Sequence, residues 1–277
     1  MWKFARLRVF LVLFCISLTV TVYALPTVAF DFGEFLRRSL PTAIEVLQLY
    51  SVSDRDEVLL AQAIDRKLKR GEVRISNNRR AQELVNELGH FLAKHSDRPD
   101  IPYTFQVVED RNVNAFATMG GFVYINTGTI AAADNIAQLA GVIAHEIGHI
   151  AGKHSLEQIR QIAIARGLAT VAGIQDEQLV NMGIELVLRL PRSRDNEFDA
   201  DRRAVLNLAR AGIAPQGIVG FMQKLERIDD GRIPVFLRTH PPTGERIQAL
   251  NQVIRDNNLS GTGGLNDREY QQAWRGL

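Results

Sequence analysis

The sequence predicts a single compact domain with an α+β fold in which helices dominate. Apolar residues recur at helical spacing over most of the chain, whereas β-forming residues cluster only between Pro102 and Gly128. The chain is 46% apolar. About 250 residues follow the N-terminal segment, which is enough for one compact domain.

Helices are expected on both sides of the β-forming segment. Their predicted ranges are 34–50, 55–69 and 79–94 before it, and 135–151, 155–170, 176–189, 194–210, 215–228 and 242–256 after it. Pro215 and Pro242 stand where a first helical turn tolerates proline. The domain is expected to span residues 25–257. A polar tail over 258–277 follows it, with a short helix ending near Trp274.

The β-forming residues fall into three short segments, 103–108, 113–118 and 122–126, which turn residues separate. We therefore expect a small antiparallel sheet. Gly120 and Gly121 stand between the second and third segments and are expected to form a hairpin turn.

The first residues have the pattern of an export signal. Lys3, Arg6 and Arg8 precede an apolar run that ends at Val22, and Ala24 offers a cleavage site, so residues 1–24 are expected to be removed. The alternative is an uncleaved anchor, since the apolar run is at the lower limit for crossing a bilayer. The single cysteine, Cys15, lies inside this segment, so the mature chain would have no disulfide.

The charge of the chain gives no support to a nucleic-acid partner. There are 33 Lys and Arg residues against 31 Asp and Glu, a net charge of +2. Removing residues 1–24 takes three basic residues and no acidic one, which leaves −1. This balance gives no reason to expect binding to a phosphate backbone.

Residues 145–149 read His-Glu-Ile-Gly-His. On a helix, His145 and His149 lie one turn apart on one face, so two imidazoles converge on one ion while Glu146 stands beside them. The surrounding residues are apolar, and Asn135 has helix-capping spacing, so the helix is expected to be buried. A buried polar trio needs an ion or hydrogen bonds to offset its desolvation. Gly148 would also let another backbone or a substrate come close.

A zinc site with two histidines needs a third protein ligand and an open position. Glu197 and Asp201 lie four residues apart on the predicted helix 194–210. Glu197 is a candidate metal ligand, and Asp201 could accept the free ring N–H of a ligating histidine. The alternative is an exposed helix whose acidic and basic residues only pair with one another.

Three blocks of sequence resemble a known family. They are Asn114-Ala-Phe with Gly120-Gly-Phe-Val-Tyr-Ile-Asn-Thr-Gly, then Leu139-Ala-Gly-Val-Ile-Ala-His-Glu-Ile-Gly-His with His154 shortly after, and Glu197-Phe-Asp-Ala-Asp joined by Arg238-Thr-His-Pro-Pro-Thr-Gly-Glu-Arg-Ile. Their order and spacing resemble the HtpX-like and CaaX-prenyl-protease group of zinc metallopeptidases, whose periplasmic branch includes BepA-like proteases. The resemblance covers about residues 105–255. No repeat array follows residue 257, so the helical-repeat extension of that branch is not expected.

The resemblance implies a zincin-like fold and a set of roles. His145, His149 and Glu197 would bind one zinc ion per chain, and Glu146 would be the catalytic base. An edge strand beside the metal would pair with an extended substrate. That strand and its turn carry Asn114, Ala115, Phe116, Gly120 and Gly121.

His240 matches a family position that faces the active site. Its place before Pro241 and Pro242 gives it a stiff junction. It could donate a hydrogen bond to the oxyanion, or occupy the open position of zinc and hold the enzyme latent. The alternative is a capping histidine on a surface turn.

The reaction expected from these residues is peptide hydrolysis. Zinc polarises the scissile carbonyl and activates water, and Glu146 takes the water proton and passes it to the leaving amine. No nucleophile suited to a covalent route is evident, because Cys15 is the only cysteine and no Gly-x-Ser-x-Gly motif occurs.

By resemblance, the protein is expected to act on unfolded or misassembled exported proteins, in a periplasm or on the outer side of an inner membrane. Membrane association is a further expectation, and the oligomeric state is left open. The alternatives are a protein-binding quality-control module with low or latent activity, and a metal-storage or structural zinc protein. The apolar segments 159–174 and 179–190 could be core, membrane-facing surface or a lid over the site.

Overall fold

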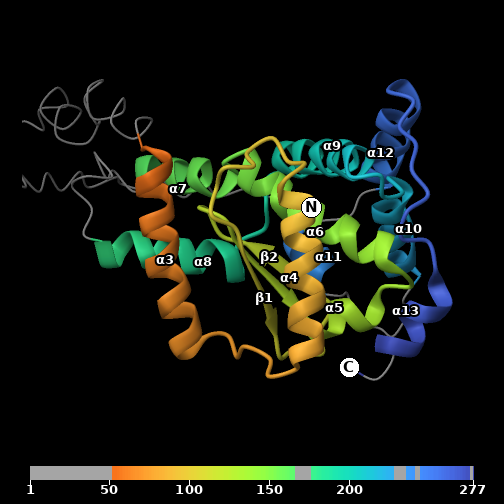
Figure 1. The fold of residues 1–277 in the computed structure, drawn as a ribbon. Coiled ribbons are helices and arrows are strands. Elements are labelled where there is room, and N and C mark those ends of the chain that lie inside the picture. The colour runs from red at the N-terminus through yellow and green to blue at the C-terminus, as the bar shows by residue number, and fades with distance from the viewer. Residues whose placement is uncertain (1–51, 166–175, 228–234, 241–243, 275–276) are drawn as a thin grey trace, which may run out of the picture. The chain divides into compact units, whose positions relative to one another are not determined.

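The computed structural model describes residues 52–165, 176–227, 235–240, 244–274 and 277 (Figure 1). The expected export signal and the helix expected over 34–50 lie outside these ranges. The described elements, in chain order, are α3 Asp54–Gly71, α4 Arg79–Ala93, β1 Thr104–Val108, β2 Ala115–Ala117, β3 Phe122–Asn126, α5 Thr127–Ala132, α6 Ile136–Ala151, α7 His154–Ala165, α8 Asp176–Arg189, α9 Arg194–Arg210, α10 Gln216–Glu226, α11 Val235–Thr239, α12 Gly244–Asp256 and α13 Asp267–Trp274.

Polar side chains determine where the main helices begin. Asn78 caps α4, Asn135 caps α6 and Ser193 caps α9, each by accepting a hydrogen bond from a backbone N–H three residues further on. Such a cap contributes about 1 kcal/mol. Helices α8 and α9 begin and end at the predicted residues. The dominance of helices is confirmed.

The sheet is mixed, so the expectation of an antiparallel sheet was wrong. The strand order is β1-β3-β2. β1 pairs parallel with β3, with Thr104 opposite Phe122, and β2 pairs antiparallel with β3, with Phe116 opposite Tyr124. Alternation of apolar residues indicates the face of the sheet to which each side chain points. It does not indicate the direction of the neighbouring strand. β2 is also shorter than the predicted segment 113–118.

Helices cover both faces of the sheet. α4 and α6 lie on one face, and α3 and α8 lie on the other (Figure 1). Two hydrophobic cores result, a larger one on the α4 and α6 side and a smaller one on the α3 and α8 side. In the central strand β3, Val123 and Ile125 belong to the larger core, whereas Phe122 and Tyr124 belong to the smaller one. A strand covered on both faces is apolar throughout rather than alternating. This explains why β3 is buried along its whole length.

Helix α6 lies at the centre of the larger core and packs against α9, α10 and α4. The segment expected as a polar tail also joins this core. Tyr270 and Trp274 on α13 are buried, and the Tyr270 hydroxyl donates to the Ile130 carbonyl at 2.7 Å. Residues four apart on a helix share one face, so Tyr270 and Trp274 both face the core.

The apolar segment 179–190 belongs to the core. Leu179, Met182 and Leu186 of α8 are buried against α3 and the sheet. The segment 159–174 is described only up to residue 165. Among the described helices, we find none with the length and apolar character needed to cross a bilayer.

Candidate active site

The two histidines of the motif project from one face of α6. Their Nε2 atoms lie 3.1 Å apart, and both side chains are buried. Two ring nitrogens at this separation repel each other unless a proton or a cation lies between them. His145 and His149 are therefore placed to share one ion.

Helix α9 brings a carboxylate to the same place. Glu197 lies in its first turn, with Oε2 3.5 Å from His145 Nε2 and Oε1 3.3 Å from His149 Nε2. The two helices approach closely because residue 148 is glycine: a Cβ there would lie 2.7 Å from the Ala200 carbonyl oxygen. The expectation that Gly148 admits another backbone is confirmed.

His240 follows α11 and completes the cluster. Donor atoms of His145, His149, Glu197 and His240 all lie within 4.8 Å of one another. His240 Nε2 is 3.4 Å from Glu146 Oε1, and its ring stacks on Phe236 with centroids 4.7 Å apart. His240 is 1% exposed, so it is not a capping residue on a surface turn.

The cluster fits a zinc ion. Zinc binds imidazole nitrogen and carboxylate oxygen, and a catalytic site uses three protein ligands and one open position. Within the described residues, no donor meets either oxygen of Glu146 with normal hydrogen-bond geometry, and His240 Nε2, 3.4 Å from Oε1, also lacks such a partner. Buried polar atoms are normally paired, so these free acceptors indicate a place for an ion, water or substrate.

A buried arginine holds the acidic side of the cluster together. Asp201 Oδ1 lies 2.9 Å from His145 Nδ1. Arg246 of α12 donates to both oxygens of Asp201, at 2.7 and 2.8 Å, and its Nη1 lies 2.7 Å from Glu197 Oε2. This bidentate contact fixes Asp201, which in turn orients the ring of His145.

Arg246→Met should lower the free energy of unfolding by about 3 kcal/mol or more, because it leaves Asp201 buried without its partner. Urea denaturation of the full chain measures the change. Arg255→Met is the matched control, since Arg255 lies on the same helix and is exposed. It should change stability by less than about 0.5 kcal/mol. A similarly small loss of unfolding free energy in both variants would contradict this stabilising role of the contact between Arg246 and Asp201.

Burial and neighbouring charges shift the pKa values of the cluster. Burial raises the pKa of Glu146 to about 7, against the opposing effects of His145 and Arg192. Burial lowers the pKa of His240 to about 3. For His145, burial lowers the pKa but Asp201 and Glu197 outweigh it and raise the value to about 9. Burial favours the neutral acid of Glu197, yet the surrounding histidines hold its pKa well below the usual range. Glu146 is thus the carboxylate suited to exchange a proton near neutral pH.

Strand β2 is one of the two edge strands of the sheet and lies beside α6, and all three of its residues are buried. Asn114 accepts a backbone hydrogen bond from Asn126, and Thr118 donates one to Phe122. By alternation, the N–H and C=O groups of Ala115 point away from β3. These outward groups are what an extended peptide would pair with.

The turn that follows β2 has the expected glycines. Gly120 and Gly121 have φ values of 65° and 101°, a region that other residues rarely adopt. The Gly120 N–H donates to the buried Glu57 Oε1 at 2.9 Å. The predicted hairpin turn is confirmed, and the two glycines lie in the turn that joins β2 to the antiparallel strand β3.

Residues 78–254 match the sequence model of peptidase family M48. This range contains the whole cluster. The chain belongs to peptidase family M48. The resemblance inferred from the sequence blocks is therefore confirmed, and the chain contains a metallopeptidase domain.

Several curated proteins are similar to this M48 chain. It is 30% identical over 207 residues to a putative beta-barrel assembly-enhancing protease of Vibrio cholerae serotype O1, covering 69% of this chain and 42% of the relative. It is 28% identical over 224 residues to metalloprotease LoiP of Escherichia coli K12, covering 76% and 85%. It is 34% identical over 155 residues to the mitochondrial metalloendopeptidase OMA1 of Arabidopsis thaliana, covering 55% and 32%. The chain thus spans about two fifths of the length of the beta-barrel assembly-enhancing proteases that it matches.

Sequence reasoning missed Arg192, which lies in the loop before α9. It is 6% exposed, and its guanidinium donates to Ser155 Oγ and to the Ala117 carbonyl oxygen, both at 2.9 Å. Its backbone N–H donates to the Thr239 carbonyl at 3.2 Å. Arg192 therefore ties α7, the β2 edge and α11 together around the M48 site. An arginine after Pro191 carries no local signal of burial, so only the tertiary contacts reveal it.

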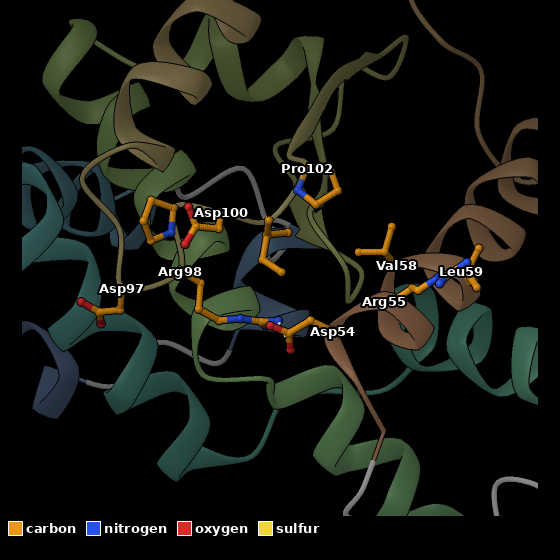
Figure 2. Close-up of a pocket in the computed structure, with 10 residues that line it drawn as sticks. Asp54, Arg55, Val58, Leu59, Asp97, Arg98, Asp100 and Pro102 are labelled. Carbon is orange, nitrogen blue, oxygen red and sulfur yellow. Dashed lines mark hydrogen bonds and ion pairs between the residues drawn. The ribbon is translucent and has the colours of Figure 1, made fainter.

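A cavity of about 470 Å³ lies away from the metal cluster, between the start of α3 and the loop 97–102 (Figure 2). Figure 2 shows the Arg98 side chain reaching to Asp54, where Nη2 lies 2.9 Å from Oδ1. Arg98 also donates to the Ile150 carbonyl near the end of α6 at 2.9 Å. None of the residues that line this cavity belongs to the metal cluster, so the chemistry of the M48 site does not take place there.

Proposed function

We propose that this protein is an exported zinc metalloendopeptidase that hydrolyses unfolded or misassembled proteins. One observation carries the proposal. His145, His149 and Glu197 converge from two helices, with the buried carboxylate of Glu146 beside them. Family M48 membership supports the same reaction class.

The side chains divide the chemistry between them. His145, His149 and Glu197 would hold one zinc ion, which supplies Lewis acidity for the scissile carbonyl and the attacking water. Glu146 takes the proton of the water and delivers it to the leaving amine. Asp201, fixed by Arg246, keeps the His145 ring in place.

The substrate would lie along β2 in an extended conformation. Ala115 offers its backbone N–H and C=O groups, and backbone pairing demands little of the peptide sequence. A protease that recognises backbone acts on any segment that is unfolded. The names of the relatives, which include beta-barrel assembly-enhancing proteases, support misassembled envelope proteins as the substrate class.

Metal analysis tests the proposal. Purified protein should carry about one zinc per chain and digest casein, and a chelator should stop the digestion. His149→Ala should lose most of the zinc, because it removes one of three ligands. His90→Ala serves as the control, since His90 is exposed on α4. Equal zinc content in wild type and His149→Ala would refute the ligand assignment.

A second candidate function is a protein-binding quality-control module with low or latent activity. The observation that favours it is the closure of the site, since His145, Glu146, His149, Glu197 and His240 are each at most 1% exposed. The two functions differ in a simple assay. A binding module suppresses aggregation of an unfolded client without fragmenting it, whereas an endopeptidase yields fragments.

Export is tested at the N-terminus. Cleavage after Ala24 should leave Leu25 as the first residue of the mature protein, because Val22-Tyr-Ala24 has small residues at the positions that a signal peptidase inspects. N-terminal sequencing of protein isolated from a periplasmic fraction measures this. A chain that keeps Met1 and stays with the membranes would instead support the anchor.

A further inference from the structure

A fourth histidine lies behind the metal cluster, which already contains His145, His149 and His240. His154 is the first residue of α7 and is 6% exposed. Its Nδ1 lies 3.0 Å from Nδ1 of His149, and its Nε2 lies 3.2 Å from Oδ2 of Asp199. His154 therefore bridges α6, which carries His149, to α9, which carries Glu197.

The positions of the ring protons follow from these contacts. Nε2 of His149 faces the cluster, 3.3 Å from Glu197 Oε1, so a metal ligand there needs the lone pair on Nε2 and the proton on Nδ1. That N–H must then donate to Nδ1 of His154. A neutral ring that accepts at Nδ1 carries its proton at Nε2, where it donates to Asp199. Both short contacts are satisfied by this arrangement of two neutral rings.

The backbone makes room for this ring. A Cβ on Gly152 would lie 2.3 Å from His154 Nε2, so only glycine leaves the space that the imidazole occupies. Lys153 has a φ of 54°, which turns the chain sharply between α6 and α7 and aims residue 154 back at His149. Asp199 is held in turn by Arg203, whose Nε lies 2.5 Å from Oδ2.

We propose that His154 is a positioning residue for the metal site. It fixes the tautomer and the ring orientation of His149, and it connects His149 to the carboxylate of Asp199 through two hydrogen bonds. The inference rests on the proposed zinc site. In this arrangement, the two metal-binding histidines of α6 have different hydrogen-bond partners at Nδ1. On the Nδ1 side, which faces away from the cluster, His145 contacts the buried Asp201 directly, whereas His149 contacts His154, which stands between it and Asp199.

Zinc affinity tests this role directly. A chromophoric chelator that competes for zinc gives the dissociation constant of the full chain, and metal analysis gives the occupancy. His154→Leu removes the acceptor and should raise the dissociation constant about ten- to hundredfold, the usual effect of losing a partner of a ligating histidine. His154→Asn keeps an acceptor oxygen near the position of Nδ1 and should restore part of the affinity. His90→Leu, on an exposed face of α4, should change nothing.

A structural role alone would give a different pattern. If His154 only packed, His154→Leu would lower the unfolding midpoint of metal-free protein without changing zinc affinity, and His154→Asn would rescue nothing. Should His154→Leu fail to fold, Asp199→Ala decides, because Asp199 is partly exposed and its loss should still weaken zinc binding about tenfold. Unchanged affinity in folded His154→Leu or Asp199→Ala would overturn the inference. Failure of the proposed function is distinct: wild type would then bind no zinc, or His149→Ala would bind it equally.

Discussion

Glu146→Gln is expected to lower casein hydrolysis at least about a hundredfold while zinc content stays at the wild-type level. The amide keeps the size of the side chain but cannot accept the proton of the attacking water. Glu146 is fully buried beside His145 and is not one of the metal donors in the cluster, so its replacement removes the base and leaves the ligands. Initial rates of casein cleavage and metal analysis on the same preparation give both quantities.

Glu83→Gln is the matched control for this experiment. Glu83 lies on α4 in an exposed pair with Arg79, so the same chemical change far from the cluster should leave the rate unchanged. A Glu146→Gln protein that cleaves casein at the wild-type rate would show that Glu146 is not the base. A variant that has lost its zinc as well would place Glu146 among the ligands.

His240→Ala is expected to raise the basal rate of casein cleavage, by about five- to hundredfold, if the imidazole holds the site latent. The geometry supports this reading, because a donor atom of His240 lies within 4.8 Å of donor atoms of His145, His149 and Glu197. An imidazole there competes with substrate for the open position of zinc. Zinc should remain bound through the other three residues.

The opposite sign would identify the other role. If His240 donates to the oxyanion, His240→Ala should keep zinc and lose about a hundredfold in turnover. His90→Ala, which alters an exposed histidine, should change neither quantity. Unchanged turnover and zinc affinity in His240→Ala would contradict both roles.

Local sequence determined the helices and the core of the site. Helices α8 and α9 match their predicted bounds because periodicity and capping act within a few residues. His145 and His149 were predictable as a pair because the pitch of one helix places them together. Glu197 and Asp201 lie about fifty residues further on, and the sequence pointed to them through their own helical spacing and the family resemblance.

Tertiary structure decided what depends on contacts between distant segments. The three β-forming segments were visible in the sequence, but the order and direction of β1, β2 and β3 depend on contacts between distant segments. The burial of Arg192 and Arg246 was not predicted, because a basic residue in a loop or an early helical turn carries no local sign of its buried carboxylate or carbonyl partner. The same holds for Tyr270 and Trp274, whose burial against the domain follows from packing rather than from the polar residues around them. Periodicity acts over one or two turns, whereas burial and pairing are set by residues a hundred or more positions away.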